Sequence, residues 1–260
     1  HGSAFPIAKL ALNNNVPPIL MASLRMGMVM LLLIPFWKFK IPDKKYLKSL
    51  ILFSISMGVM VYVFMNLSLK HSSFISPIII GAQLAVPFAV LLSAKMIGES
   101  ISPKKWMYVI LAFVGIIIVF FDPELKNNLL GLFFASLMAL FFAIAQVYSR
   151  QLKELSLIIL NAYTGFFGFF VLIVVSFFVE GEVIINIKNI NFESWILISY
   201  QAVIVSLFAH MSMFYLYKFY TVGQIFPFYS LFPIFGIILA FLIFGEIPSI
   251  LFFIGSFIVI

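Results

Sequence analysis

The stretch LAVPFAVLLSAKMIGE at residues 84–99 reveals how the chain is organised, because a similar stretch, LFPIFGIILAFLIFGE, occurs at residues 231–246. Both are apolar segments that close with the pair Gly-Glu. When the two stretches are superposed, Glu99 aligns with Glu246 at an offset of 147 residues. A long apolar segment that recurs with the same polar ending indicates that part of the chain is duplicated.

A second pair of landmarks lies near the start of each copy. Lys9 and Arg150 each close an apolar helix that would open its half, and they align at an offset of 141 residues. Landmarks that recur at similar offsets indicate an internal repeat. We therefore expect two similar halves, the first at residues 1–122 and the second at residues 128–260.

The whole chain has the composition of a membrane protein. Of its 260 residues, 64% are hydrophobic and only 10% are charged, whereas soluble domains carry about 25% charged residues. The nine acidic residues all lie between apolar runs or at their ends. The basic residues stand singly or in short loops, so the net charge of +7 does not form a nucleic-acid-binding surface. Cysteine is absent, which excludes disulfides and thiolate metal sites.

Eight apolar runs of the sequence are long enough to cross a membrane. About 20 helical residues are needed to span the hydrocarbon layer of roughly 30 Å. The runs therefore predict an all-α, polytopic membrane helix bundle. Two shorter apolar pieces, 1–12 and 248–260, are expected to be parts of a truncated first and last helix, which makes ten transmembrane helices. The long runs are 17–36, 47–69, 74–97, 103–121, 128–150, 156–179, 194–217 and 224–244.

The basic residues are divided unevenly between alternate loops. One set of loops holds ten lysines and arginines and the other holds three, while Lys9, Arg25 and Lys95 lie within helices. Because basic residues near short loops stay on the cytoplasmic side, ten helices would leave both termini in the cytoplasm. Five helices per half is an odd number, so the halves insert in opposite senses. This is the inverted repeat on which alternating access depends.

Several short motifs, in this order and spacing, resemble one family of carriers. They are HGSAFPIAK at residues 1–9, PPILMASLR at residues 17–25 and the two Gly-Glu ends, and together they are similar to the EamA-type members of the drug/metabolite transporter superfamily. The opening looks most like the bacterial exporters of cysteine and O-acetylserine, which usually have Trp-Gly where this chain has His1 and Gly2. The resemblance implies a ten-helix bundle with a central cavity in the bacterial inner membrane. It also implies export of amino acids or related small metabolites rather than enzyme activity.

Arg25 is the strongest candidate for substrate binding. It lies eight residues into the run that starts at Pro17, about 12 Å deep by helical rise. A charge at that depth needs a partner, a wet cavity or a path to the interface. Since guanidinium binds carboxylates through two parallel hydrogen bonds, Arg25 either receives a substrate carboxylate or snorkels to the headgroups as a structural residue. Lys9 lies near the same level, and one interpretation is that the two cations form an anion-attracting vestibule.

The remaining substrate-site candidates are polar side chains within apolar runs. His210 ordinarily gains a proton near neutral pH, so it either relays protons or packs as a hydrogen-bonded histidine. Neutral polar residues either line a cavity or hold two helices together, and a tyrosine alternatively belongs to the interfacial belt. The neutral candidates are Asn66, Gln83, Gln146, Tyr148 and Asn161.

Two acidic residues and two prolines are candidates for gating. Glu99 and Glu246 end their helices on opposite membrane faces, where a carboxylate either pairs with a basic residue of another helix or marks the interface. Pro87 and Pro233 fall near the starts of the two matching stretches. Each removes a helical hydrogen bond, which predicts a kink or a hinge.

Other chemistries find no support in the sequence. It has no phosphate-binding glycine loop, no His-x-x-x-His pair and no nucleophile elbow, so we expect neither a metal nor a cofactor. No acid lies at mid-membrane depth, so transport would follow the substrate gradient, or exchange protons through His210 or the substrate itself. Two alternatives remain open. One is a carrier of larger amphipathic cargo, such as drugs or nucleotide- and lipid-linked solutes. The other is a membrane enzyme or structural partner, although an enzyme would cluster carboxylates or histidines that this chain scatters.

Overall fold

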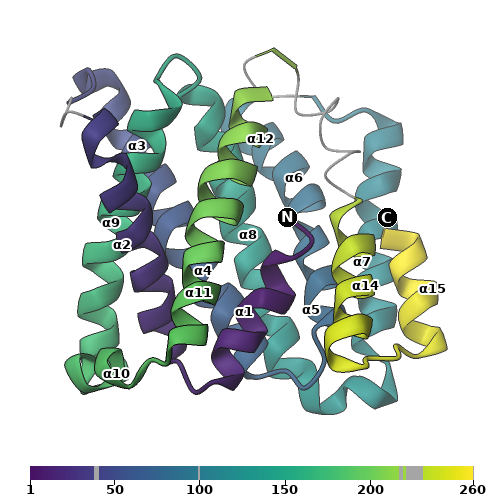
Figure 1. Cartoon of the computed structure of the whole chain (residues 1–260). Coiled ribbons are helices and arrows are strands. Elements are labelled where there is room, and N and C mark those ends of the chain that lie inside the picture. Colours follow the sequence, from purple (N-terminus) through teal and green to yellow (C-terminus); the bar gives the residue numbers. More distant parts are fainter. Residues whose placement is uncertain (38–40, 99, 217–218, 221–230, 260) are drawn as a thin grey trace.

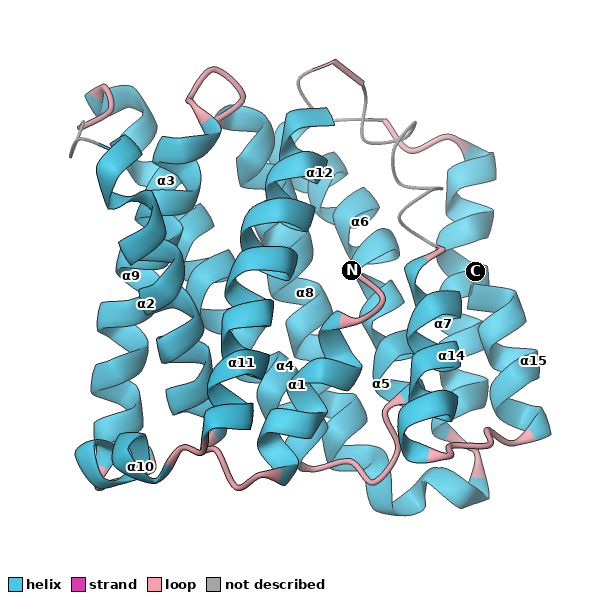
Figure 2. Ribbon diagram, viewed as in Figure 1, coloured by secondary structure: helices cyan, strands magenta, loops and turns pink. Residues whose placement is uncertain are grey.

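The computed structural model describes residues 1–37, 41–98, 100–216, 219–220 and 231–259. Within these ranges the chain forms helices joined by loops, and no strand occurs among them (Figure 2). The prediction of an all-α fold is confirmed for this part of the chain. The helices stand side by side in one bundle, and their loops gather at an upper and a lower rim (Figure 1).

The first part of the chain contains two long rods built from joined helical segments. One rod passes through a π-helical turn, η1, and the other through a single 3-10 turn, η2. The elements are α1 (Ala4–Asn13), α2 (Pro18–Trp37), α3 (Lys44–Ile55), η1 (Ser56–Met60), α4 (Val61–Lys70), α5 (Ser76–Gly81), η2 (Ala82–Leu84), α6 (Ala85–Ile97), α7 (Pro103–Phe120) and η3 (Pro123–Asn128).

The second part of the chain also contains a rod interrupted by π-helix. Its segment η4 lies in the rod Phe192–Met213, as η1 lies in the rod Lys44–Lys70 of the first part. Because π-helical segments rotate the side chains that follow and often occur at functional sites, both rods are of interest below. The elements are α8 (Leu129–Gln151), α9 (Leu157–Val179), α10 (Val183–Asn189), α11 (Phe192–Tyr200), η4 (Gln201–His210), α12 (Met211–Leu216), α14 (Phe232–Phe244) and α15 (Ile250–Val259).

Seven of the described helical rods are long and apolar enough to cross a membrane. Each lies within a few residues of a run that the sequence predicts. The helix Phe232–Phe244 is shorter than its predicted run, 224–244, because the start of that run lies outside the described residues. The seven are Pro18–Trp37, Lys44–Lys70, Ser76–Met96, Pro103–Phe120, Pro123–Gln151, Leu157–Val179 and Phe192–Met213. The described helices therefore have the length and composition of a multi-pass membrane protein, while the number of ten helices stays a prediction.

The outer surface of the bundle is apolar. Large side chains such as Phe178 and Phe257 are 78% and 86% exposed. Exposed apolar surface of this extent is unfavourable in water and ordinary in lipid. The surface therefore agrees with the membrane assignment made from helix length.

Corresponding helices of the two parts pack against each other at the two ends of the bundle. α2 lies along α9 at one end, and α7 lies along α15 at the other (Figure 1). Gly115 and Gly255 meet so closely that a Cβ atom on either one would lie 2.6 Å from the carbonyl oxygen of the other. Small residues let membrane helices associate through their backbones. The reciprocity of this contact indicates a two-fold relation between the two parts.

The two Gly-Glu ends have the same local structure. Gly98 ends α6 with φ of 75°, and Gly245 ends α14 with φ of 67°. Glycine reaches this left-handed region without steric cost and so terminates helices. α6 ends at the upper rim and α14 at the lower rim (Figure 1). The repeated segment therefore runs in opposite directions in the two parts, as an inverted repeat requires.

Candidate functional site

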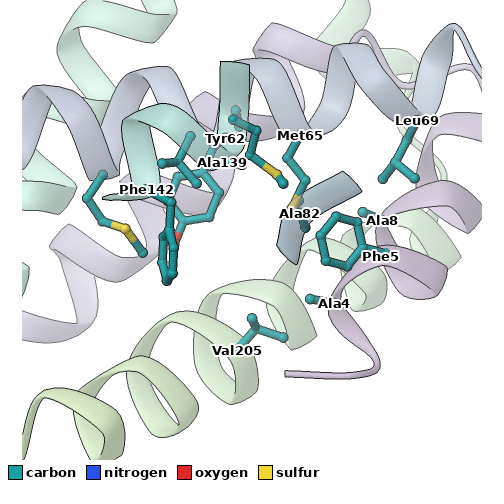
Figure 3. Close-up of a cluster of buried hydrophobic side chains, with 14 of the residues drawn as sticks. Ala4, Phe5, Ala8, Tyr62, Met65, Leu69, Ala82, Ala139, Phe142 and Val205 are labelled. Carbon is teal, nitrogen blue, oxygen red and sulfur yellow. The ribbon is translucent and has the colours of Figure 1, made fainter. Parts of the chain in front are cut away.

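A small cavity of about 50 Å³ lies between helices of both parts of the chain. Figure 3 shows several of its apolar wall residues turned toward one another, from α1, α4, α8 and η4. The polar members of the wall are His1, Arg25, Tyr62 and His210. The others are Ala4, Phe5, Val61, Met65, Ala82, Met138, Ala139, Phe142, Val205 and Phe232.

Arg25 is buried in the wall of this cavity, with only 2% of its surface exposed. Its Nε donates a hydrogen bond to Ser206 Oγ at 2.8 Å. Its guanidinium carbon lies 4.1 Å from the centre of the Tyr62 ring, which is a cation–π contact. Its Nη1 has no hydrogen-bond partner among the described residues. The guanidinium is therefore held on two sides and keeps donor capacity at the cavity.

The helices that carry these three residues explain how they meet. Arg25 lies seven residues after the start of α2, about 10 Å along the helix. Gly27 of the same helix packs against Phe169 of α9, which fixes the rotation of α2. Tyr62 follows the π-helical turn η1, and Ser206 lies within the π-helical segment η4. The two π-helical rods thus supply the ring and the hydroxyl that hold the guanidinium.

His210 lies at the end of η4 and also lines the cavity. Its Nδ1 is 2.8 Å from the carbonyl oxygen of Val205, and its ring meets the His1 ring edge-on with centroids 4.6 Å apart. A carbonyl oxygen only accepts, so Nδ1 carries the proton and Nε2 is the acceptor atom of the neutral ring. The structure brings His210 and Arg25, both predicted as substrate-site residues, to the same cavity.

The charge of the cavity wall is one-sided. Among the described residues that line it, Arg25 is a permanent cation and none is acidic. A buried charge without a counter-ion is costly, and cation–π and hydroxyl contacts offset only part of that cost. An anionic group entering the cavity would supply the missing partner.

Lys9 lies elsewhere. Its Nζ donates to the carbonyl oxygens of Leu69 and Ser72, each at 2.7 Å, at the C-terminal end of α4. A cation at a helix C-terminus is stabilised by the unpaired carbonyls and the helix dipole. Lys9 is not among the lining residues, so the structure does not place it with Arg25 in a shared vestibule.

The five neutral candidates are buried or half-buried but do not line the cavity. Asn66 donates to the carbonyl oxygen of Pro18 at 2.8 Å and so joins α4 to α2. Asn161 donates to Leu157 of its own helix at 2.8 Å. Gln83 lies in η2, next to the lining residue Ala82. Gln146 and Tyr148 lie in α8.

The gating candidates are placed as follows. Glu246 accepts hydrogen bonds from the backbone N–H groups of Ile75 and Ser76 at 2.6 and 3.0 Å, rather than from a basic side chain. Glu99 lies outside the described residues. Pro87 lies in the first turn of α6, three residues after the 3-10 turn η2 ends, and it supplies no N–H to that preceding turn. Pro233 occupies the first turn of α14, where a missing N–H costs the helix nothing.

The sequence did not predict three residues whose contacts matter in the structure. Tyr62 and Ser206 look like ordinary members of apolar runs, so no signal marked them. Glu180 ends an apolar run as Glu246 does, and that ending was a usable signal. In the structure, Glu180 accepts hydrogen bonds from the backbone of Ile19 and Leu20 at 2.7 and 2.8 Å.

Comparison with known proteins gives the family. No curated protein matches the chain significantly. A solved structure described as "Crystal structure of protein" superposes with a TM-score of 0.68 over 99% of this chain and 91% of that chain, at 16% identity, and so shares the fold. The model of the EamA-like transporter family matches twice, at residues 1–121 and 129–260. Since these two matches cover almost all of the sequence, the chain belongs to the EamA-like transporter family.

Proposed function

We propose that this protein is a secondary transporter that exports amino acids or related small metabolites by alternating access. The proposal rests on the buried Arg25. Its Nη1 has no hydrogen-bond partner among the described residues, and no acidic residue is among the described residues that line the cavity. A guanidinium binds a carboxylate in a charge-assisted, geometrically defined way. The substrate's carboxylate would bind at Arg25, and its side chain would contact the apolar wall.

The size of the cavity supports alternating access. A single water needs about 10–15 Å³ of such volume, so a cavity of about 50 Å³ holds a few waters. An amino acid is larger, so the wall must move apart before the substrate enters. The cavity therefore corresponds to a conformation that is too narrow to hold the substrate. The wall comes from both parts of the chain, so relative movement of the two repeats would open it.

The membrane topology belongs to the same proposal. We take residues 1–122 and 128–260 as the two repeats, with five helices each and the loops rich in lysine facing the cytoplasm of a bacterial cell. The rim that carries Lys153, between α8 and α9, would then be cytoplasmic. The opposite rim carries the C-terminal ends of α9 and α14 (Figure 1). Both termini would lie on the cytoplasmic side of the protein.

One observation favours a second candidate substrate class. Apart from its four polar members, the described cavity wall is apolar, with Phe5, Phe142 and Phe232 among its residues. Such a wall also suits a larger amphipath that presents an anionic group to Arg25. Exchange assays with substrates of graded size separate this class from amino acids.

The test is solute exchange in liposomes that contain the reconstituted protein. Labelled cysteine, O-acetylserine, serine and alanine are offered against the same unlabelled solute, together with the amine analogues that lack the carboxylate. We expect exchange of at least one amino acid and none of its decarboxylated analogue. Exchange of bulky amphipathic anions alone would favour the second class. Equal exchange of acids and amines would contradict the role of Arg25.

A further inference from the structure

Two carboxylates that follow helices of the second part cap two helices of the first part. Glu180 directly follows α9, and its two oxygens accept from the N–H groups of Ile19 and Leu20 at 2.7 and 2.8 Å. Glu246 follows α14, and its two oxygens accept from Ile75 and Ser76 at 2.6 and 3.0 Å. The same two-oxygen arrangement thus occurs twice, each time between the two parts of the chain.

Both capped positions are helix beginnings that need acceptors. The first N–H groups of a helix have no partner within it and form the positive end of its dipole. α2 is preceded by Pro17 and begins with Pro18, which have no N–H, so Ile19 and Leu20 are its first donors. At α5 the two donors are Ile75, the residue just before the helix, and Ser76, its first residue. A carboxylate bound across two such donors holds the helix end firmly.

Each carboxylate also accepts from a serine hydroxyl. Ser176 donates to Glu180 at 2.7 Å, and Ser76 donates to Glu246 at 2.8 Å. Among the described residues, each carboxylate accepts hydrogen bonds from three neutral donors. Glu246 is only 6% exposed and Glu180 is half-buried. Two of the three donors to each carboxylate are backbone N–H groups at a helix start. Moving that helix start away would leave these N–H groups without an acceptor.

The capped helices lead to the cavity. α2 carries Arg25 seven residues beyond its first residue, and α5 continues into Ala82, which lines the wall. α2 and α5 start at the lower rim of Figure 1, where α9 and α14 end. The upper rim carries the lysine-rich loops. The two caps therefore tie the walls of the cavity to the second part of the chain at one face only.

From these contacts we infer that Glu180 and Glu246 form the latch of the lower rim. They keep the cavity closed on that face by holding the starts of α2 and α5 against α9 and α14, and the cavity opens there when the two caps are released. This inference rests on the proposed transport function, because a latch matters only if the cavity must open. Glu180 thus has the same role as Glu246, and each carboxylate holds the N-terminus of a helix.

The test exploits the absence of cysteine from the chain. A single reporter, Ala139→Cys, places a thiol on the cavity wall in α8, away from both capped helices. A membrane-impermeant maleimide is applied to membrane vesicles of known sidedness, and its labelling rate is measured from each face. Glu180→Gln combined with Glu246→Gln should raise labelling from the lower face by about tenfold, the effect expected from losing two helix caps. Labelling from the upper face should not rise.

The matched control is the double variant Glu124→Gln with Glu193→Gln. Both are exposed acids of the same rim, and neither side chain forms a hydrogen bond or an ion pair with the described residues. It should label at the parent rate. The single variants Glu180→Gln and Glu246→Gln should each give a smaller rise, which keeps the test informative if the double variant does not fold.

Several outcomes would overturn the latch. They are an unchanged rate in all the Glu180 and Glu246 variants, an equal rise from both faces, and an equal rise in the control. Labelling needs no substrate, so its result is independent of the exchange assay. If no amino acid is exchanged but labelling rises as expected, the amino-acid substrate is wrong and the latch is still supported.

Discussion

The guanidinium carbon of Arg25 lies 4.1 Å from the centre of the Tyr62 ring, and the two side chains share the wall of one cavity. The contact leaves the cation stacked on one face and bound through Nε to Ser206, with Nη1 unpartnered among the described residues. Arg25 is thereby held in a fixed orientation before any ligand arrives. Preorganisation of this kind lowers the cost of binding an anion.

Replacing Arg25 should remove carboxylate recognition. Arg25→Ala should abolish exchange of carboxylate substrates. Arg25→Lys should weaken their affinity by about 10- to 100-fold, because a buried charge-assisted hydrogen bond contributes about 1.5–3 kcal/mol. The measurement is concentration-dependent exchange in liposomes. Arg150→Gln removes the other arginine of the chain, which lies outside the cavity, and should leave the affinity unchanged. Full activity of Arg25→Ala would remove this residue from the site.

The ring of Tyr62, rather than its hydroxyl, should stabilise Arg25. The hydroxyl is 3.4 Å from Ser206 Oγ, at the outer limit of a hydrogen bond, whereas the ring supports the cation directly. Tyr62→Leu should therefore cost about 0.5–2 kcal/mol of stability, and Tyr62→Phe should cost much less. Thermal unfolding of the detergent-solubilised protein measures both. Equal losses in the two variants would show that the hydroxyl matters instead.

The contact between Gly115 and Gly255 should tolerate no added carbon. A Cβ on either residue would lie 2.6 Å from a backbone oxygen, which cannot rotate away. We expect Gly115→Ala and Gly255→Ala each to destabilise the protein by about 1–3 kcal/mol, as overpacking does. Gly81→Ala is the control, since its nearest neighbour is a side-chain carbon at 3.2 Å. It should lower the unfolding temperature less than the other two, and the reverse order would contradict the close packing of α7 on α15.

The loop after α8 should add a small pH dependence to stability. The Tyr46 hydroxyl donates to Glu154, and with Lys45 and Lys153 nearby these contacts lower the pKa of Glu154 below its usual 4.5. A lowered pKa in the folded state means that ionised Glu154 contributes stability above pH 4.5, and that this contribution is lost as the pH falls through the lowered value.

Glu154→Gln tests this dependence. At neutral pH the variant should unfold at a slightly lower temperature than the parent, because an exposed contact contributes little. The two unfolding temperatures should converge in acid. A constant difference across the acid range would show that Glu154 acts through packing and not through its charge.

Much of the helical architecture could be predicted from the amino-acid sequence. A helix in lipid must satisfy its own backbone groups, so an apolar run of sufficient length becomes a helix with little dependence on its neighbours. The described helices accordingly fall close to the predicted runs. The two Gly-Glu helix ends could also be predicted, because Gly98 and Gly245 terminate their helices through their own backbone conformation and need no distant partner.

The candidate substrate site could be predicted from the sequence only in part. Depth along a helix follows from counting residues, so Arg25 was recognised as a buried cation. The direction in which a side chain points depends on how its helix is rotated against others, so counting could not separate Lys9, which caps α4, from Arg25, which lines the cavity. The π-helical segments η1 and η4 add to the difficulty, because they change the rotation of Tyr62 and Ser206 within their own rods.

Local sequence is enough to specify the membrane helices, the duplicated segment with its two Gly-Glu ends, and an arginine far inside an apolar helix. Helix formation and helix ending depend on nearby residues and on the solvent, so these features follow from the order of the residues alone. Which polar groups meet depends instead on the tertiary structure. Arg25 binds Ser206 across 181 positions, and Glu180 caps Ile19 across 161 positions. Such partners are chosen by the packing of whole helices against one another, and no local pattern encodes that packing.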